Sequence, residues 1–367
     1  MRPTRVLLVG PAPAGPDSRG GMATVTRLML DDPDPSFEIT CIPTYLDTAV
    51  WHRTWVGVLG ALTAAWRVLT GRVDVLHVHL AHGGSVARKA IPLLAARLRG
   101  VPAVVHGHSF DFVGWFERLP APARAVVRAA LPARRWLVLG STLASEYARA
   151  LRLAPDAVEV LYNPVAIAAD AVDQHRPGPL TVVALGRLGE RKGSFDLVAA
   201  VAALPPQTRA AVRVIAAGDG AVAEVRQAVA QSGISDILTV KDWISPAERD
   251  ELLRAAHVFA LPSYHEGLPM ALLEAMTVGL VPLTSPVGGI PEVITDDVTG
   301  LLVAPGDRDA LAQALSRLAG DPHLRARLGA AARARADDFA VSGWYDRLHA
   351  LWRALANAPA TAPSPTR

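Results

Sequence analysis

Two glutamates, Glu266 and Glu274, stand with seven residues between them in a stretch that combines a loop with a helix start. Residues 257–262, just before them, form an apolar run that predicts a buried strand. Pro269 suits the first position of a helix, because its missing N–H would be unpaired there anyway. The predicted order is therefore strand, tight loop and helix, with one carboxylate at the loop and one in the helix.

A helix start of this kind can bind an anion. The backbone amides of Gly267, Leu268 and Met270 are candidates to meet a phosphate, while the two carboxylates could accept hydrogen bonds from sugar hydroxyls. The combination indicates a nucleotide-sugar ligand. The alternative is a helix whose acidic residues only complement its dipole.

A basic loop follows the apolar run at residues 180–185. Arg187 and Lys192 lie in it and could neutralise a diphosphate. The lysine is informative because the chain has only 3 Lys against 34 Arg, and a compact ammonium acts as a point charge. A solvated basic loop is the alternative. Gly218 ends the next expected strand in a second short loop.

Other candidates lie in the first half of the chain. Gly20 and Gly21 follow the first expected strand and precede a helical segment, where glycines allow a phosphate to approach the backbone. His106 and His108 have a spacing that a metal could use. With no third ligand nearby and one isolated cysteine, we expect no metal. Asp111 either orients an acceptor or caps the next helix.

Residues 77–89 form another strand-to-helix loop. His79, Arg88 and Lys89 could meet an acceptor phosphate, although alternate histidines on one strand face are often part of a core.

Twelve short apolar runs alternate with helical stretches, as expected for parallel sheets buried on both faces. The expected strands lie at residues 6–9, 39–42, 75–79, 103–106, 136–139, 158–161, 180–185, 212–216, 238–240, 258–261, 281–284 and 300–303. The pattern predicts an α/β protein of two doubly wound Rossmann-like domains facing across a cleft, at residues 1–165 and 166–356. Residues 357–367 are expected to be a disordered tail.

The composition fits a globular protein of 367 residues, with 51% hydrophobic and 19% charged residues. A single cysteine excludes a disulfide framework and favours a reducing compartment. The first apolar run is too short for a signal-peptide core. The net charge is +6 over residues 1–165 and −3 over the rest, which invites an anionic partner. Nucleic acid is not expected, because no binding motif is present and aromatic residues are few.

Residues 51–67 combine aromatic and cationic side chains. Trp51, Trp55 and Trp66 lie with Arg53 and Arg67 on a predicted helix that could enter a membrane interface. A buried amphipathic helix explains the pattern almost as well.

The motif at residues 265–274, followed by residues 288–292 and 299–303, resembles the C-terminal half of the family 4 retaining glycosyltransferases. The resemblance extends over nearly the whole chain and implies the GT-B fold. It implies that Arg187 and Lys192 clamp the donor diphosphate, that the loop of Gly20 and Gly21 abuts it, and that Gly218 lies near the nucleotide. By the same resemblance His108 contacts the donor sugar, and the spacing leaves His106 as the alternative.

The expected activity is therefore transfer of a hexose, with retention, from a UDP- or GDP-sugar, without metal or other cofactor. The catalytic set is His108, Glu266, Arg187 and Lys192, and Glu274 holds the ribose. The acceptor set is His79, Arg88, Lys89 and Asp111, for a saccharide or polyprenyl-linked acceptor in exopolysaccharide or cell-wall assembly. The expected location is the cytoplasm, with peripheral attachment to the inner face of the cell membrane as an option. A sugar-nucleotide epimerase and a non-catalytic nucleotide-sugar-binding protein are the alternatives.

Overall fold

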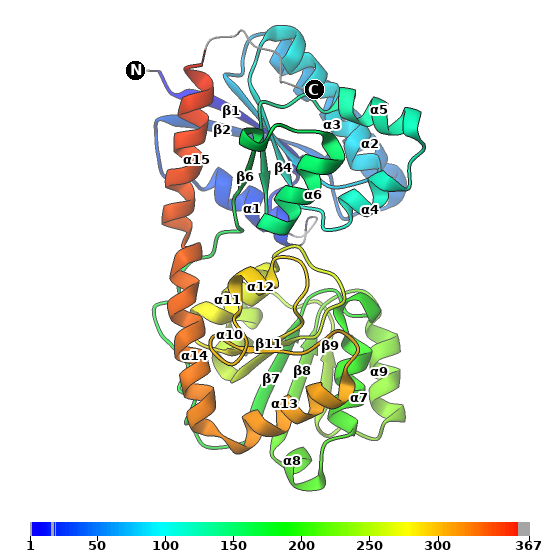
Figure 1. Ribbon diagram of the computed structural model, residues 1–367, viewed down its shortest axis with the longest axis vertical. Coiled ribbons are helices and arrows are strands. Elements are labelled where there is room, and N and C mark those ends of the chain that lie inside the picture. The colour runs from blue at the N-terminus through cyan, green and yellow to red at the C-terminus, as the bar shows by residue number, and fades with distance from the viewer. Residues whose placement is uncertain (1, 16–17, 19, 359–367) are drawn as a thin grey trace. The chain divides into compact units, whose positions relative to one another are not determined.

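The structure, a computed structural model, describes residues 2–15, 18 and 20–358, and its chain folds into two compact α/β units. The first contains residues up to Asn163 together with the chain from Ser342 onward, and the second contains Pro164–Val341. Each unit is built around one parallel six-stranded sheet with helices on both faces (Figure 1). All twelve predicted strands are present, so the predicted fold class is confirmed.

The first sheet has the strand order β2-β1-β3-β4-β5-β6. Its strands are β1 (Thr4–Pro11), β2 (Phe37–Tyr45), β3 (Val75–Leu80), β4 (Ala103–Gly107), β5 (Arg135–Val138) and β6 (Val158–Val160). The helices of this unit are α1 (Gly21–Leu30), α2 (Val50–Leu69), α3 (Gly84–Arg99), α4 (Phe112–Glu117), α5 (Ala121–Ala130), α6 (Ser141–Leu151) and α15 (Val341–Ala356), with a short 3-10 turn η1 (Pro155–Ala157).

The second sheet has the order β12-β11-β10-β7-β8-β9. Its strands are β7 (Leu180–Leu185), β8 (Val212–Ala217), β9 (Leu238–Lys241), β10 (Val258–Leu261), β11 (Val281–Thr284) and β12 (Leu301–Leu302). The helical elements of this unit are η2 (Glu190–Lys192), α7 (Ser194–Ala202), α8 (Pro206–Ala210), α9 (Val222–Gln231), α10 (Pro246–Ala255), α11 (Met270–Thr277), α12 (Ile290–Val293), α13 (Arg308–Gly320), α14 (Pro322–Ala336) and η3 (Asp337–Phe339).

The strand order in this second sheet reverses between β10 and β7. The chain leaves β7 toward β8 and returns on the other side of β7 to form β10. Ligands of doubly wound sheets bind at the carboxyl ends of the strands at such a switch point. The fold therefore places the loops after β7 and β10 where a ligand is expected.

The C-terminal helix α15 belongs to the first unit, and the predicted domain of residues 166–356 is wrong there. Leu348 and Trp352 have no exposed surface, and Trp352 packs edge-on against His77 of β3. Tyr345 Oη donates to the carbonyl of Leu28 at 2.6 Å, which fastens the helix to α1. Figure 1 shows α15 running alongside the first sheet. The helix covers apolar surface that the first unit would otherwise expose.

The first residues of the second unit, from Pro164 to the start of β7, are hydrogen-bonded to its other elements. Gln174 is buried, and its side-chain amide donates to the carbonyls of His257 and Gly279 at 3.1 and 2.8 Å. Arg325 of α14 donates to the carbonyl of Gln174 at 3.0 Å. These bonds join the segment to the second unit. Residues 359–367, where most of the predicted tail falls, lie outside the described residues.

Candidate active site

The loops after β7 and β10 come together because their strands are neighbours in the sheet. The backbone N–H of Tyr264 donates to the carbonyl of Arg191 at 2.9 Å. Gly193 has a φ of +66°, and a Cβ there would lie 1.9 Å from the carbonyl oxygen of Pro262. Only glycine permits this approach of the two backbones. The contact fixes the basic loop against the loop that carries Glu266.

Where these two loops meet, a buried carboxylate, that of Glu266, is surrounded by cationic side chains. Glu266 is 6% exposed, and its Oε1 lies 2.6 Å from Lys192 Nζ and 3.7 Å from a guanidinium nitrogen of Arg191. Ser263 Oγ donates to the same oxygen at 2.7 Å. Two cations thus face the single carboxylate of Glu266, and a negatively charged ligand beside them would be attracted to both.

The sequence predicted Glu266 and Lys192 but missed Arg191 and Ser263. A signal for each was present, because Arg191 precedes Lys192 directly and Ser263 stands three residues before Glu266. The sequence alone does not show that Arg191 and Ser263 contact Glu266, because those contacts depend on the pairing of β7 with β10.

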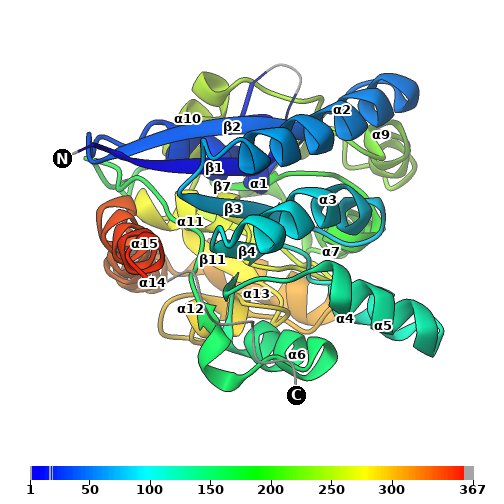
Figure 2. The same cartoon turned by 90° about the horizontal axis from the view of Figure 1, so that it is seen from above.

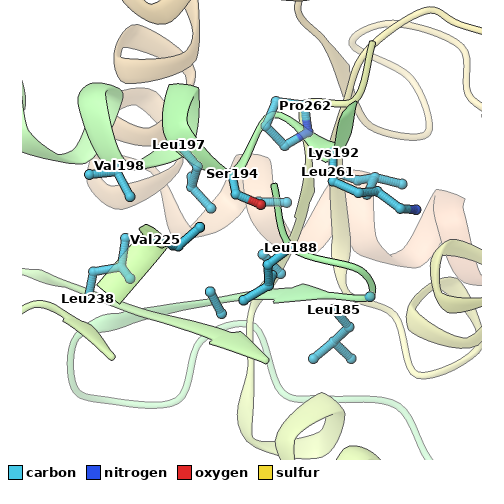
Figure 3. A pocket seen from close by; sticks show the side chains of 14 residues that line it. Leu185, Leu188, Lys192, Ser194, Leu197, Val198, Val225, Leu238, Leu261 and Pro262 are labelled. Carbon is cyan, nitrogen blue, oxygen red and sulfur yellow. The ribbon is translucent and has the colours of Figure 1, made fainter. Parts of the chain in front are cut away.

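A small cavity opens beside this group, at the carboxyl end of β7 (Figure 3). Its lining includes Gly186, Lys192, Ser194 and Pro262, and most of the remaining lining side chains are leucine, valine and alanine. Lys192 and Ser194 are the polar side chains in an otherwise apolar wall. Lys192 thus forms part of the cavity wall, while its ammonium group contacts Glu266.

A glycine is required at position 218 because the loop after β8 packs closely against the loop after β7. A Cβ at Gly218 would lie 1.6 Å from the carbonyl oxygen of Gly186. The N–H of Leu188 donates to the carbonyl of Asp219 at 2.7 Å, which holds the two loops side by side. Arg187 lies 3.6 Å from the carboxylate of Asp219, with a side chain 70% exposed. The guanidinium of Arg187 is therefore accessible to a ligand, and the predicted contact with a diphosphate requires this accessibility.

The helix that carries the second glutamate starts one residue later than predicted. Pro269 occupies the cap position, and α11 begins at Met270. The N–H of Gly289 donates to the carbonyl of Gly267 at 2.7 Å. Gly288 has a φ of +57°, and a Cβ there would lie 1.9 Å from the carbonyl oxygen of Glu266. The loop of residues 266–268 is thus clamped on one side by residues 288–289.

Glu274 meets a partner that the sequence did not suggest. Its Oε1 lies 3.1 Å from a guanidinium nitrogen of Arg249 in α10. Burial raises the pKa of the Glu274 carboxyl, and the charge of Arg249 opposes that rise. Arg249 follows no recognisable motif, so only the packing of α10 against the sheet could reveal it.

In the first unit, Gly20 caps α1 with a φ of +91°, and a Cβ there would meet no atom of the described residues within 4 Å. Gly21 is the first residue of the helix. The backbone at this helix start is therefore open to an approaching group, as predicted for a phosphate loop.

Four histidines gather on one face of β3 and at the end of β4. His79 pairs in register with His106, and His79 Nδ1 lies 2.8 Å from His108 Nε2. Trp352 Nε1 donates to His77 Nδ1 at 3.2 Å. Burial lowers the pKa of His77 and His108 to about 3, and it lowers the pKa values of His79 and His106 well below the usual range. The imidazoles are therefore neutral at pH 7.

The expectation that no third histidine lies near His106 is wrong. Nitrogen atoms of His77, His79 and His106 lie within 4.8 Å of one another, and several have no hydrogen-bond partner among the described residues. A tetrahedral zinc ion holds ligand nitrogens roughly 3.3 Å apart, so binding would require the rings to move closer. The buried Lys89 raises the electrostatic cost of a cation there, because its charge further lowers the pKa of His79.

The predicted acceptor residues divide into buried and accessible ones. His79 and Lys89 are 0% and 2% exposed, so neither is presented to an acceptor, and this part of the prediction is wrong. Lys89 Nζ donates to Thr44 Oγ1, and burial lowers the pKa of the Lys89 ammonium to about 7. Arg88 is half-buried, and Asp111 pairs with Arg118 at 3.3 Å on the surface.

Comparison with known proteins identifies the family. The model described as glycosyltransferase family 4 matches residues 21–169, and the model described as glycosyl transferases group 1 matches residues 168–335. An alpha-maltose-1-phosphate synthase of Mycolicibacterium smegmatis is 30% identical over 300 residues, which cover 71% of this chain and 73% of that protein. This chain belongs to glycosyltransferase family 4.

A second family 4 relative is D-inositol 3-phosphate glycosyltransferase of Streptomyces scabiei, 29% identical over 75% of this chain and 66% of that protein. Among solved structures, HepE of Anabaena in complex with UDP has a TM-score of 0.76 at 17% identity, with 96% of this chain and 100% of that chain covered. The likeness confirms the GT-B fold that the resemblance implied.

Proposed function

We propose that the chain is a retaining hexosyltransferase that uses a UDP- or GDP-sugar. The observation that carries the proposal is the pair of cations, Lys192 and Arg191, that lie around Glu266 at the carboxyl ends of β7 and β10. A diphosphate is an anion that such a pair of cations would attract. The solved structures of HepE with UDP and with UDP-glucose support a nucleotide-sugar donor.

The proposed catalysis is electrostatic. As the bond between sugar and diphosphate breaks, negative charge grows on the leaving phosphate. Lys192 and the exposed Arg187 stabilise that charge, together with the backbone amides of Gly267 and Leu268. These cations belong to the chain itself, and for this reason we propose a reaction that needs no metal ion.

The other predicted residues orient the donor. Glu274 accepts hydrogen bonds from the ribose hydroxyls, and Glu266 keeps Lys192 in place while its second oxygen faces the sugar. From the first unit, Gly20 and Gly21 serve the diphosphate and His108 serves a sugar hydroxyl, in the roles that family 4 assigns to matching positions. The acceptor attacks the face from which the diphosphate leaves, so the configuration is retained without a covalent intermediate.

For the acceptor we propose a saccharide carried on a polyprenyl diphosphate, in exopolysaccharide or cell-wall assembly. The net charge of +6 over residues 1–165 suits an anionic lipid head group, and such a lipid lies in the cell membrane. We accordingly place the reaction at the inner face of that membrane. Arg88 and Asp111 remain the accessible candidates for acceptor contact.

A donor screen tests the proposal. Nucleotide release from UDP- and GDP-sugars is measured with and without a membrane lipid extract, for the wild type, Lys192→Ala and the control Lys241→Ala. Lys241 ends β9 on the surface. We expect release that requires the extract, and a loss of roughly 10- to 100-fold for Lys192→Ala only.

Each rival has its own outcome in this screen. Equal release without extract would point to hydrolysis or to an epimerase with the same fold. Tight UDP or GDP binding without release from any donor would favour a non-catalytic binding protein. Equal losses in both lysine variants would remove Lys192 from the mechanism.

A further inference from the structure

Helix α2 turns its large apolar side chains outward. Trp51, Trp55 and Trp66 are 71%, 61% and 66% exposed, and Leu59 and Leu62 are exposed between them. These positions recur every three to four residues, so they form one stripe along the 20-residue helix. A surface helix of a globular protein ordinarily shows polar residues on this face.

The opposite face of α2 consists mainly of small residues. Gly57, Gly60, Ala61 and Ala64 are buried, and a Cβ at Gly60 would lie 2.1 Å from the carbonyl oxygen of Pro43. The helix therefore packs against β2 closely enough that larger residues at Gly60 would not fit. Because this fit fixes the rotation of α2, the tryptophans cannot turn inward without losing it.

Helix α3 lies beside α2 (Figure 2). Its own exposed side chains add a second apolar stripe. Ile91, Leu94 and Leu98 are 39%, 45% and 79% exposed, at a spacing of three to four residues. We call α2 and α3 with these exposed side chains the apolar face. Apolar patches of this extent on soluble proteins mark sites of interaction.

The charges around the apolar face have one sign. Neither α2 nor α3 contains an aspartate or glutamate. Exposed arginines lie near the ends of the helices, with Arg67 in the last turn of α2 and Arg97 and Arg99 in the last turn of α3. Between Asp47 and Asp111 the sequence has only Asp74 as an acidic residue, and Asp74 is paired with Arg5 at 2.9 Å. The partner of this face is therefore apolar and anionic.

We infer that the apolar face docks the protein onto an anionic lipid bilayer, with the three tryptophans at the level of the head groups. Tryptophan favours that level because its ring is apolar while its N–H can reach water, and arginines beside it attract anionic lipids. No helix in the described part of the chain is long and apolar enough to cross a membrane, so α2 would lie in the plane of the interface. The inference stands whether or not the proposed sugar transfer is correct.

Vesicle flotation with the full chain tests the inference. The probes are vesicles of phosphatidylcholine alone and with phosphatidylglycerol, and the variants are Trp51→Ser/Trp55→Ser/Trp66→Ser and Arg97→Gln/Arg99→Gln. We expect wild-type binding to anionic vesicles, a loss of at least about tenfold in the tryptophan variant, and a loss of roughly tenfold in the arginine variant. Brominated lipids should quench the wild-type tryptophan fluorescence.

The matched control is Ile167→Ser/Val298→Ser, which removes two exposed apolar side chains from the second unit. It should float like the wild type. Circular dichroism of every variant shows that the fold is intact, and UDP binding, measured separately, keeps a failure of the sugar-transfer proposal distinct from this result.

The inference is overturned if wild-type protein ignores anionic vesicles, or if the tryptophan variant floats as well as the control. A wild type that is dimeric in solution, and becomes monomeric in the tryptophan variant without any binding to vesicles, would assign the apolar face to a second copy of the chain.

Discussion

At the scale of single residues, the site depends on which side chains neutralise and hydrogen-bond one buried carboxylate, that of Glu266. Glu266 has Lys192, Arg191 and Ser263 around a single oxygen. Burying an ion pair of this kind changes the stability of the fold little while both charges are present. Removing one charge leaves the other buried and unpaired, which lowers the stability strongly. Lys192, which we propose as a diphosphate ligand, therefore also makes Glu266 necessary for the stability of the fold.

Mutation of this pair should show strong coupling. We expect Glu266→Gln to lower the free energy of unfolding by about 3 kcal/mol, because Lys192 then has no counter-charge beside it, and Lys192→Ala to lower it by less, because Glu266 keeps the more distant Arg191. The double variant should lose less than the sum of the two, by about 0.5–3 kcal/mol. Urea unfolding followed by circular dichroism measures all three. Strict additivity would contradict a direct interaction between these side chains.

At the scale of secondary-structure elements, β3 and β4 carry the histidines as a neutral, dry group. The cause is burial, since all four rings lie where a positive charge would have no water to solvate it. His108 lies at the end of this group and bonds to His79. His79 is thus placed to fix the orientation of the His108 ring, a role different from the acceptor contact expected for it.

This group predicts that the first unit is sensitive to acid. A histidine whose pKa is lower in the folded chain than in the unfolded chain takes up its proton only on unfolding. The stabilisation is complete above the unfolded pKa of about 6.5, and it is lost as the pH falls toward the folded value of about 3, by about 1.4 kcal/mol per pH unit for each histidine.

Urea unfolding between pH 7.5 and 5 measures the effect by tryptophan fluorescence, since most of the tryptophans lie in the first unit. The variant His106→Leu should reduce the slope of unfolding free energy against pH below 6.5 by about one proton. An unchanged slope would show that His106 does not remain neutral in the folded chain.

At the scale of the whole molecule, the last helix of the chain completes the first unit. Helix α15 buries Leu348, Trp352 and Leu355, and Trp352 also donates to His77 in the dry histidine group. The chain thus passes through the second unit before it returns to finish the first. The stability of the first unit therefore depends on α15, which begins at Val341, although the preceding strand of this unit, β6, ends at Val160.

We expect Trp352→Ala to destabilise the first unit by about 3–5 kcal/mol, because it leaves a large cavity and an unbonded histidine nitrogen. Hydrogen–deuterium exchange locates the effect, with lost protection in β1 to β5 and unchanged protection in β7 to β11. The exposed Asp346→Ala is the control, and it should change stability by less than about 0.5 kcal/mol. Lost protection across β7 to β11 would instead return α15 to the second unit.

The local features of this protein can be read from its amino-acid sequence alone. All twelve strands were predicted because a strand buried on both faces must be a short apolar run, and such runs can be read residue by residue. The loop residues Lys192, Gly218 and Glu266 were found in the same way, because a ligand site at strand ends needs glycine for close backbone approach and charge for binding.

Which side chains contact one another depends on how the elements pack, and it cannot be read from the sequence. The contacts of Arg249 with Glu274, and of His77 with His79 and His106, depend on sheet register and helix packing across long stretches of sequence. Apolar spacing in α2 and α15 looks alike from the sequence, yet α15 turns its tryptophans inward and α2 turns three outward. Periodicity fixes that a helix has an apolar stripe, and only the packed neighbours fix whether protein or another partner covers it.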